Sequence, residues 1–87
     1  MSRNYFLIQE IYQNGNFSYW GKNHKNLPLN SGKDNYELAL IIQEIGYKTK
    51  QNAIKGIKTL KKYLKEIGIN YKYYKFKIQA INLIKGE

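Results

Sequence analysis

The side chains that most often perform chemistry in enzymes are scarce in this sequence. It contains no cysteine, which excludes a thiol nucleophile and a thiolate metal site. Its one histidine, His24, lies beside Lys22 and Lys25 in a polar stretch where we expect it to be exposed. No local motif joins this histidine to a serine and an acid, as a catalytic triad would require. We therefore expect no catalytic residue, no cofactor and no enzymatic activity.

Carboxylates offer a second kind of chemistry, because hard cations such as Mg²⁺ bind carboxylate oxygens. Four acidic residues lie in the first half of the sequence: Glu10, Asp34, Glu37 and Glu44. Their spacing matches no metal-binding motif, and we predict no metal site.

Lysine is the remaining candidate. The formal net charge is +9, and its distribution is uneven. Residues 1–47 hold four basic and four acidic residues, whereas residues 48–87 hold eleven basic and two acidic residues. Concentrated positive charge attracts polyanions. AT-rich codons offer another explanation for the abundance of Lys, Ile, Asn and Tyr, which together make 45 of the 87 residues, but not for the placement of the charge.

A helix from Lys50 to Ile67 would position most of these lysines. Thr49 is a suitable N-cap and Gly68 a suitable terminator. Five apolar residues recur at helical spacing on one stripe: Ala53, Ile57, Leu60, Leu64 and Ile67. Four lysines recur on the opposite side: Lys55, Lys58, Lys62 and Lys65, with Lys61 at the border. Gly56, which costs about 1 kcal/mol relative to alanine inside a helix, indicates close approach of the helix to a sheet.

The segment Tyr71–Ile84 alternates like a long strand. Tyr74, Phe76, Ile78 and Ala80 share the predicted core face, and Tyr73, Lys75, Lys77 and Gln79 share the other face. Aromatic residues interleaved with lysines are typical of proteins that bind single strands on a sheet. The candidate nucleic-acid-binding residues are therefore Lys48, Lys50, Lys55, Lys58, Lys61, Lys62, Lys65, Tyr73, Lys75 and Lys77, with Lys75 and Lys77 expected to flank the lysines of the helix.

The first half predicts a hairpin and one further element. Tyr5–Tyr12 and Phe17–Gly21 read as strands, and Asn14-Gly15 between them favours a type I′ turn. Residues 22–35 read as a loop. Leu38–Ile45 reads as a third strand buried on both faces, with a short helix as the alternative.

Together these elements predict a single α+β domain over residues 1–87. The order is β-β-β-α-β, with one long amphipathic helix packed across an antiparallel sheet of about four strands. The longest aliphatic run, Leu38–Ile42, is far too short for a membrane span, and no apolar signal-peptide core follows Met1. We expect a cytoplasmic protein that has no membrane partner.

Two segments echo each other at a constant offset: residues 16–23 and residues 75–82 both carry phenylalanine, a small residue and asparagine in register. With Tyr47-Lys48-Thr49-Lys50 and Ala53-Ile54-Lys55-Gly56-Ile57, this pattern resembles the YegP-like family of small β-β-β-α repeat domains. The resemblance implies one full repeat and a partial second repeat. It implies a fold and an open sheet edge, but no activity.

These observations predict a non-catalytic basic protein that binds RNA or single-stranded DNA, with RNA favoured over DNA, or a nucleoprotein complex. Small, strongly polarised proteins of AT-rich composition are typical of phages and mobile elements. By that analogy we expect an inhibitor of a nucleoprotein defence, of the anti-CRISPR type, acting in the cytoplasm of a bacterial host. The alternative is a homodimeric interaction module that pairs through an open sheet edge, with its charge serving solubility.

Overall fold

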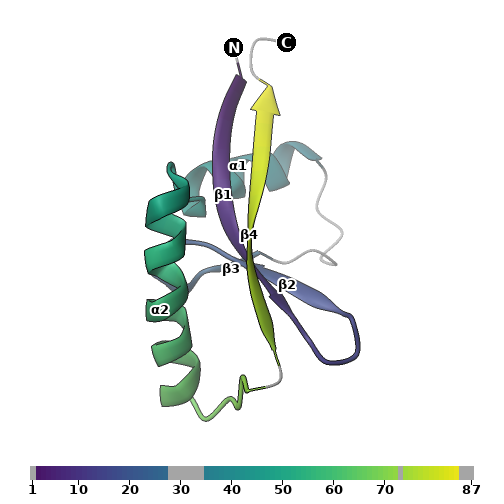
Figure 1. Ribbon diagram of the computed structural model, residues 1–87. Helices are drawn as coiled ribbons and strands as arrows, with labels where there is room; N and C mark the ends of the chain where they lie inside the picture. Colours follow the sequence, from purple (N-terminus) through teal and green to yellow (C-terminus); the bar gives the residue numbers. More distant parts are fainter. Residues whose placement is uncertain (1, 28–34, 73, 85–87) are drawn as a thin grey trace.

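The computed structural model describes residues 2–27, 35–72 and 74–84, and it has an α+β fold. The described strands are β1 (Ser2–Ile11), β2 (Phe17–Trp20), β3 (Asn26–Leu27) and β4 (Lys75–Ile84); the helices are α1 (Asn35–Ile45), α2 (Lys50–Glu66) and the short 3₁₀ helix η1 (Lys22–His24). Figure 1 shows α2 lying along the two long strands, β1 and β4.

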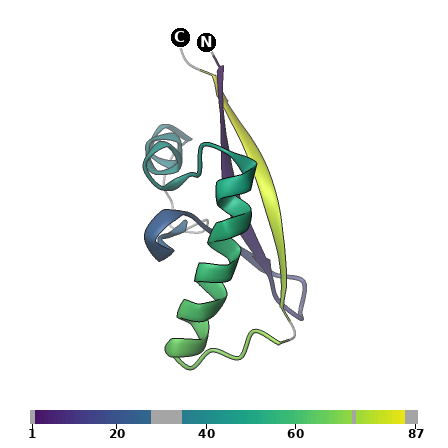
Figure 2. The ribbon, with the colours of Figure 1, turned by 60° about the vertical axis from the view of Figure 1, so that its left-hand side comes forward.

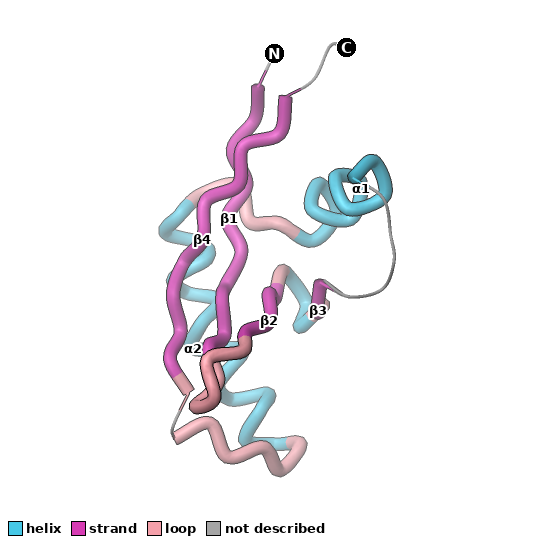
Figure 3. The backbone as a smooth tube through the Cα atoms, turned by 90° about the vertical axis from the view of Figure 1, so that its right-hand side faces the viewer, coloured by secondary structure: helices cyan, strands magenta, loops and turns pink. Residues whose placement is uncertain are grey.

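The four strands form one antiparallel sheet in the order β3-β2-β1-β4. β1 is the central strand. It pairs with β4 along its whole length, from Ser2 opposite Ile84 to Ile11 opposite Lys75, and with β2 only along its last four residues. Figure 3 shows this arrangement, with β2 and β3 diverging from the long pair.

The predicted hairpin between β1 and β2 is confirmed, but its turn is not of type I′. Of the two central residues, only Gly15 has a positive φ, of 90°. The Gly15 amide donates to the Tyr12 carbonyl at 3.0 Å, and the Tyr12 amide donates to the Asn16 carbonyl at 2.7 Å. A three-residue loop that ends on a left-handed glycine therefore makes the connection.

The prediction of a third strand at Leu38–Ile45 is wrong, because this segment belongs to α1. Leu38, Ile41, Ile42 and Ile45 follow helical spacing, and these four side chains pack into the core. Leu40, which a strand buried on both faces would have covered, is 47% exposed. The helical spacing of the core residues therefore indicates the structure of this segment better than its unbroken run of apolar residues does.

The third strand is β3 instead, which lies inside the predicted loop 22–35. Its two residues pair with Tyr19 and Trp20 of β2, and Leu27 is buried. The remainder of that predicted loop, up to residue 34, lies outside the described residues. The predicted element order therefore becomes β-β-β-α-α-β.

The last strand begins four residues later than predicted, at Lys75. The Tyr74 amide donates to the Tyr71 carbonyl at 3.0 Å, which closes a turn before the strand. Tyr74 packs edge-on against Tyr12, with ring centroids 5.0 Å apart. Ala80, expected in the core, is exposed.

The core is divided between the two sides of β1, because successive side chains of a strand point to opposite faces. Tyr5 and Leu7 belong to a cluster with Leu27 of β3 and with Ile42 and Ile45 of α1. Ile8 belongs to a second cluster, with Leu60 and Leu64 of α2. Figure 2 shows α2 running alongside the long strand pair, and Figure 3 shows α1 on the other side of that pair from α2.

The predicted helix over residues 50–67 is confirmed as α2. The Thr49 hydroxyl accepts a hydrogen bond from the Asn52 amide at 3.1 Å, and Gly68 follows the helix with φ of 85°. Ala53, Leu60 and Leu64 are buried as predicted. Ile67 is not, since it is 50% exposed at the last turn.

Candidate nucleic-acid interface

The outer face of α2 is a row of exposed ammonium groups. Four of its exposed lysines lie on one stripe, Lys55, Lys58, Lys62 and Lys65, and we call this set the helix lysine face. Lys50 is also exposed, at the first turn, but it lies about 120° around the helix axis from Lys62. The capped N-terminus and the buried stripe on the opposite side fix the orientation of the helix. At 1.5 Å per residue, Lys55 and Lys65 are about 15 Å apart along the axis. Glu66 is the only acidic residue within the helix, so most of this charge has no local counter-charge.

Lys61 differs from these lysines, as its border position predicted. Its side chain is half-buried, and its Nζ lies 5.2 Å from the centroid of the Phe76 ring of β4. A cation at this distance over an aromatic face is attracted by the ring. Lys61 therefore joins α2 to the sheet and contributes less than its neighbours to the exposed charge.

Lys75 and Lys77 do not flank the helix lysine face. Phe76 and Ile78 of β4 pack in the cluster under α2. The lysines that alternate with them, Lys75 and Lys77, therefore point to the opposite side of the sheet. Both are exposed there. Lys48 is exposed just before α2, and Tyr73 lies outside the described residues. The structure thus separates the predicted residues into a helix group and a sheet group.

The short helix η1 packs against the C-terminal half of α2 through the ring of His24. The His24 ring stacks on the Tyr63 ring, with centroids 4.3 Å apart and planes 6° from parallel. Trp20 meets the same Tyr63 ring edge-on at 6.4 Å. The prediction of an exposed His24 is therefore wrong, because stacking leaves this histidine half-buried.

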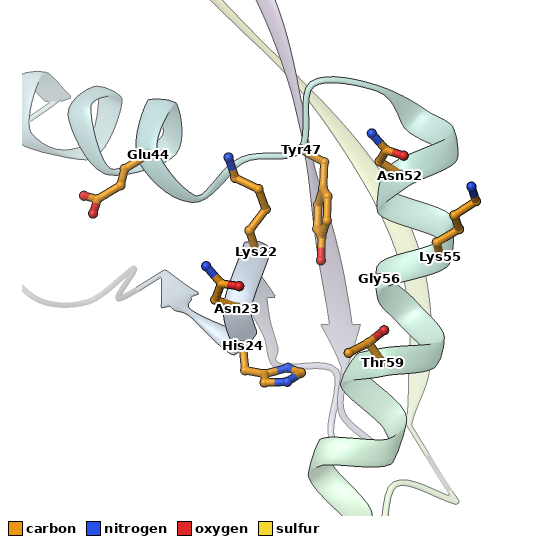
Figure 4. A pocket seen from close by; sticks show the side chains of 9 residues that line it. All are labelled: Lys22, Asn23, His24, Glu44, Tyr47, Asn52, Lys55, Gly56 and Thr59. Carbon is orange, nitrogen blue, oxygen red and sulfur yellow. The ribbon is translucent and has the colours of Figure 1, made fainter.

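A pocket of about 520 Å³ lies between η1 and α2, beside the helix lysine face. Figure 4 shows its lining side chains, which are Lys22, Asn23 and His24 of η1, Glu44 of α1, Tyr47, and Asn52, Lys55, Gly56 and Thr59 of α2. Lys55 thus belongs both to this pocket and to the helix lysine face. Sequence analysis did not predict the pocket.

Tyr47 is fixed at the inner side of this pocket. Its backbone makes two hydrogen bonds with Phe6 of β1, at 2.8 and 2.9 Å. Its ring lies against Gly56, where an added Cβ would fall 2.2 Å from the hydroxyl oxygen and 2.6 Å from Cζ. Gly56 therefore marks close approach to a tyrosine ring, and not to the sheet itself. Burial raises the pKa of the Tyr47 hydroxyl, which keeps it protonated and able to donate.

The acidic residues do not converge on one point. Glu10 is buried on the α2 side of β1, where its Oε1 accepts a hydrogen bond from Trp20 Nε1 at 3.1 Å. Its Oε2 has no hydrogen-bond partner among the described residues. Glu44 lies at the pocket on α1, and Asp34 lies outside the described residues. In the part of the chain that the structure covers, no three histidine, aspartate or glutamate side chains group as metal ligands would.

Among the described residues, no helix combines the length and the apolar character that a transmembrane helix needs. Comparisons with protein-family models, with curated proteins and with solved structures gave no match. The resemblance to the YegP-like family therefore stays a prediction.

Proposed function

We propose that this protein binds nucleic acid through the helix lysine face and catalyses no reaction. The expected ligand is RNA or single-stranded DNA, with RNA favoured, either free or within a nucleoprotein complex. The observation that carries the proposal is the row of four exposed lysines, Lys55, Lys58, Lys62 and Lys65, on one side of a capped helix that is packed on the sheet and contains one acidic residue. A cationic row of this kind neutralises phosphates and releases their counterions.

The chemistry of lysine favours contacts to the phosphate backbone. Its ammonium group is a compact charge without the planar fork with which arginine reads guanine. The protein has one arginine, Arg3 of β1, which lines a small pocket with Lys48 and is not part of the helix lysine face. We therefore expect binding that depends weakly on base sequence and strongly on salt.

Fluorescence anisotropy with labelled single-stranded RNA and DNA tests this proposal. If four lysines of the face each neutralise one phosphate, the slope of log K against log salt should be about −3, at roughly −0.7 per phosphate for a single strand. The double variant Lys58→Glu, Lys62→Glu should abolish binding and leave the circular dichroism spectrum unchanged, because both side chains are exposed.

The chain provides a matched control for that variant. Lys75→Glu, Lys77→Glu changes the net charge by the same amount, from +9 to +5, but on the opposite side of the sheet. This control should retain most of the affinity. Equal losses of affinity in both variants would mean that net charge alone, and not the helix lysine face, determines binding. A slope of log K against log salt near zero would exclude the electrostatic mechanism.

One further observation favours a second function, a homodimeric interaction module. β4 is an edge strand of ten residues, and within the described structure only β1 pairs with it. Its two charges lie near its start, which leaves residues 78–84 uncharged. An edge of this length is a template for strand addition. Light scattering after size-exclusion chromatography would show a dimer at micromolar concentration if this function holds, and a monomer if it does not.

A role as an inhibitor of a nucleoprotein defence, of the anti-CRISPR type, is a narrower form of the first function. It would place the helix lysine face in a channel that normally holds a guide or a target strand. Pull-down from a bacterial lysate, followed by identification of protein and nucleic acid together, separates it from binding to free RNA. Recovery of RNA without a protein partner would contradict it.

A further inference from the structure

The pocket between η1 and α2 is lined mainly by hydrogen-bond donors. Lys22 and Lys55 bring ammonium groups from η1 and α2, and Asn52 and Thr59 bring an amide and a hydroxyl from α2. The Tyr47 hydroxyl adds one more donor, and no described hydrogen bond uses it. Figure 4 shows Lys22 and Lys55 on either side of Tyr47, with their ammonium groups directed away from each other, so both side chains would turn inward to hold one ligand. A cavity with this lining is matched by a ligand that accepts several hydrogen bonds at once.

The charge of the pocket favours an anion. Its lining has two lysines and one carboxylate, that of Glu44. In Figure 4 the Glu44 carboxylate points away from Tyr47 and α2, so it does not oppose an anion held between the two lysines. A bare metal ion does not fit this set, because the two ammonium groups would repel it. A phosphate group matches the pocket in two ways: its negative charge suits the two lysines, and its oxygens can accept hydrogen bonds from the donors of the lining.

Part of the lining is already held in place. Hydrogen bonds to Phe6 fix the backbone of Tyr47, and stacking on Tyr63 fixes His24. Asn23 and His24 both have positive φ, of 56° and 58°, a conformation uncommon outside glycine. Such conformations persist where the surrounding structure holds them. This frame is formed before the ligand arrives, so the conformational entropy lost on binding comes mainly from the side chains of Lys22 and Lys55.

Lys55 connects this pocket to the helix lysine face. It lines the pocket, and it is also an exposed member of the row that continues to Lys65. A strand whose phosphate occupies the pocket can therefore continue along the row. We infer that this pocket is a binding site for one phosphate group of a nucleic acid strand, held between Lys22 and Lys55 and anchoring the strand at one end of the helix lysine face. The inference rests on the proposed function, since it names a specific subsite of the same surface.

Amide chemical shifts of the full chain labelled with ¹⁵N provide the test. Inorganic phosphate, adenosine monophosphate and adenosine are titrated separately at constant ionic strength. Phosphate and the monophosphate should shift the amides of Asn23, His24 and Thr59, whereas adenosine should leave them unchanged. Equal shifts with adenosine would show a base site and overturn the inference. So would phosphate shifts spread along α2 without the η1 amides.

A matched pair of variants tests the assignment of Lys22. Lys22→Gln should weaken phosphate binding about tenfold, as expected for the loss of one charge-assisted hydrogen bond. Lys25→Gln removes the same charge three residues away, from an exposed side chain that does not line the pocket, and should change the affinity less than twofold. Tyr47→Phe should weaken binding roughly fivefold. Equal effects of the two lysine variants would overturn the inference.

The two proposals fail in different ways. Phosphate shifts in the pocket without any binding of single-stranded oligonucleotides would overturn the proposed function and the strand contact, and would leave a site for a small phosphorylated molecule. Oligonucleotide binding that Lys22→Gln does not weaken, with no phosphate shift at η1, would overturn the pocket and leave the helix lysine face as the binding surface.

Discussion

Replacing Gly56 with alanine should destabilise the fold, although alanine is the better helix former. In an exposed helix the change would add about 1 kcal/mol to the free energy of unfolding. Here the new Cβ would lie 2.2 Å from the Tyr47 hydroxyl oxygen and 2.6 Å from Cζ. Carbon atoms in contact normally sit about 3.5–4.0 Å apart, so the ring would have to retreat by about 1 Å.

The ring has little freedom to retreat, because two backbone hydrogen bonds to Phe6 hold the residue that carries it. Overpacking of this kind costs about 1–3 kcal/mol. Subtracting the gain in helix propensity of about 1 kcal/mol leaves a net loss of up to about 2 kcal/mol. For a domain of this size that loss corresponds to a fall in Tm of up to roughly 15 °C.

Urea unfolding, followed by circular dichroism and by the fluorescence of Trp20, measures the effect. The decisive comparison is the same substitution in a Tyr47→Ala background, where the ring is absent and Gly56→Ala should stabilise by about 1 kcal/mol. Gly68→Ala is the control. Gly68 has positive φ and open space around it, so its substitution should cost about 1 kcal/mol in both backgrounds. If Gly56→Ala stabilised the protein with Tyr47 present, the described contact would be wrong.

Three further predictions follow from single contacts. Thr49→Ala should lower the free energy of unfolding by about 1 kcal/mol through loss of the α2 N-cap, while Thr49→Ser retains it; urea unfolding of both variants checks this, and equal losses would contradict it. Trp20→Phe removes the donor to the buried Glu10 carboxylate and should cost about 2–3 kcal/mol, measured by circular dichroism; Glu10→Gln in the same background should recover part of that loss. Burial raises the pKa of the Tyr47 hydroxyl above its ordinary value of 10.0. Above pH 10 the folded state therefore keeps a proton that the unfolded state loses. The contribution of Tyr47 to the free energy of unfolding is thus fully present below pH 10 and falls as the pH rises above that value. Urea unfolding at pH 9 and pH 10.5 should show a smaller fall for Tyr47→Phe than for the wild type, and an equal fall would contradict the assignment.

The features that sequence predicted best are those set by local chemistry. The cap at Thr49, the stop at Gly68 and the buried stripe through Leu60 and Leu64 all lie within one segment, and the structure has each of them. The alternation of Phe76 with its lysine neighbours likewise predicted correctly which of these side chains of β4 pack in the core. In these segments the period of the apolar residues determines which side chains face inward, and this does not depend on which element packs against them.

Prediction failed where tertiary contacts decide. The run Leu38–Ile42 has the apolar character of a buried strand, and only its spacing through Ile45 distinguishes the amphipathic helix that forms. Lys75 was expected to flank the helix lysines, but a strand face has no fixed relation to a helix until the side on which the helix packs is known. The pocket depends on contacts such as His24 with Tyr63, which are 39 residues apart in the sequence and leave no local signal.

The pairing of the first strand with the last has a consequence for folding kinetics. Asn4 and Asn82 form a side-chain hydrogen bond at 2.7 Å across 78 residues, and every residue of β1 opposes a residue of β4. Contacts of such high sequence separation slow the search for the native state. During synthesis the central strand must wait for β4 to emerge, whereas the hairpin of β1 with β2 and the helix α2 can form earlier. Until β4 arrives, one edge of β1 stays open, and this interval is when the chain is most exposed to misassociation.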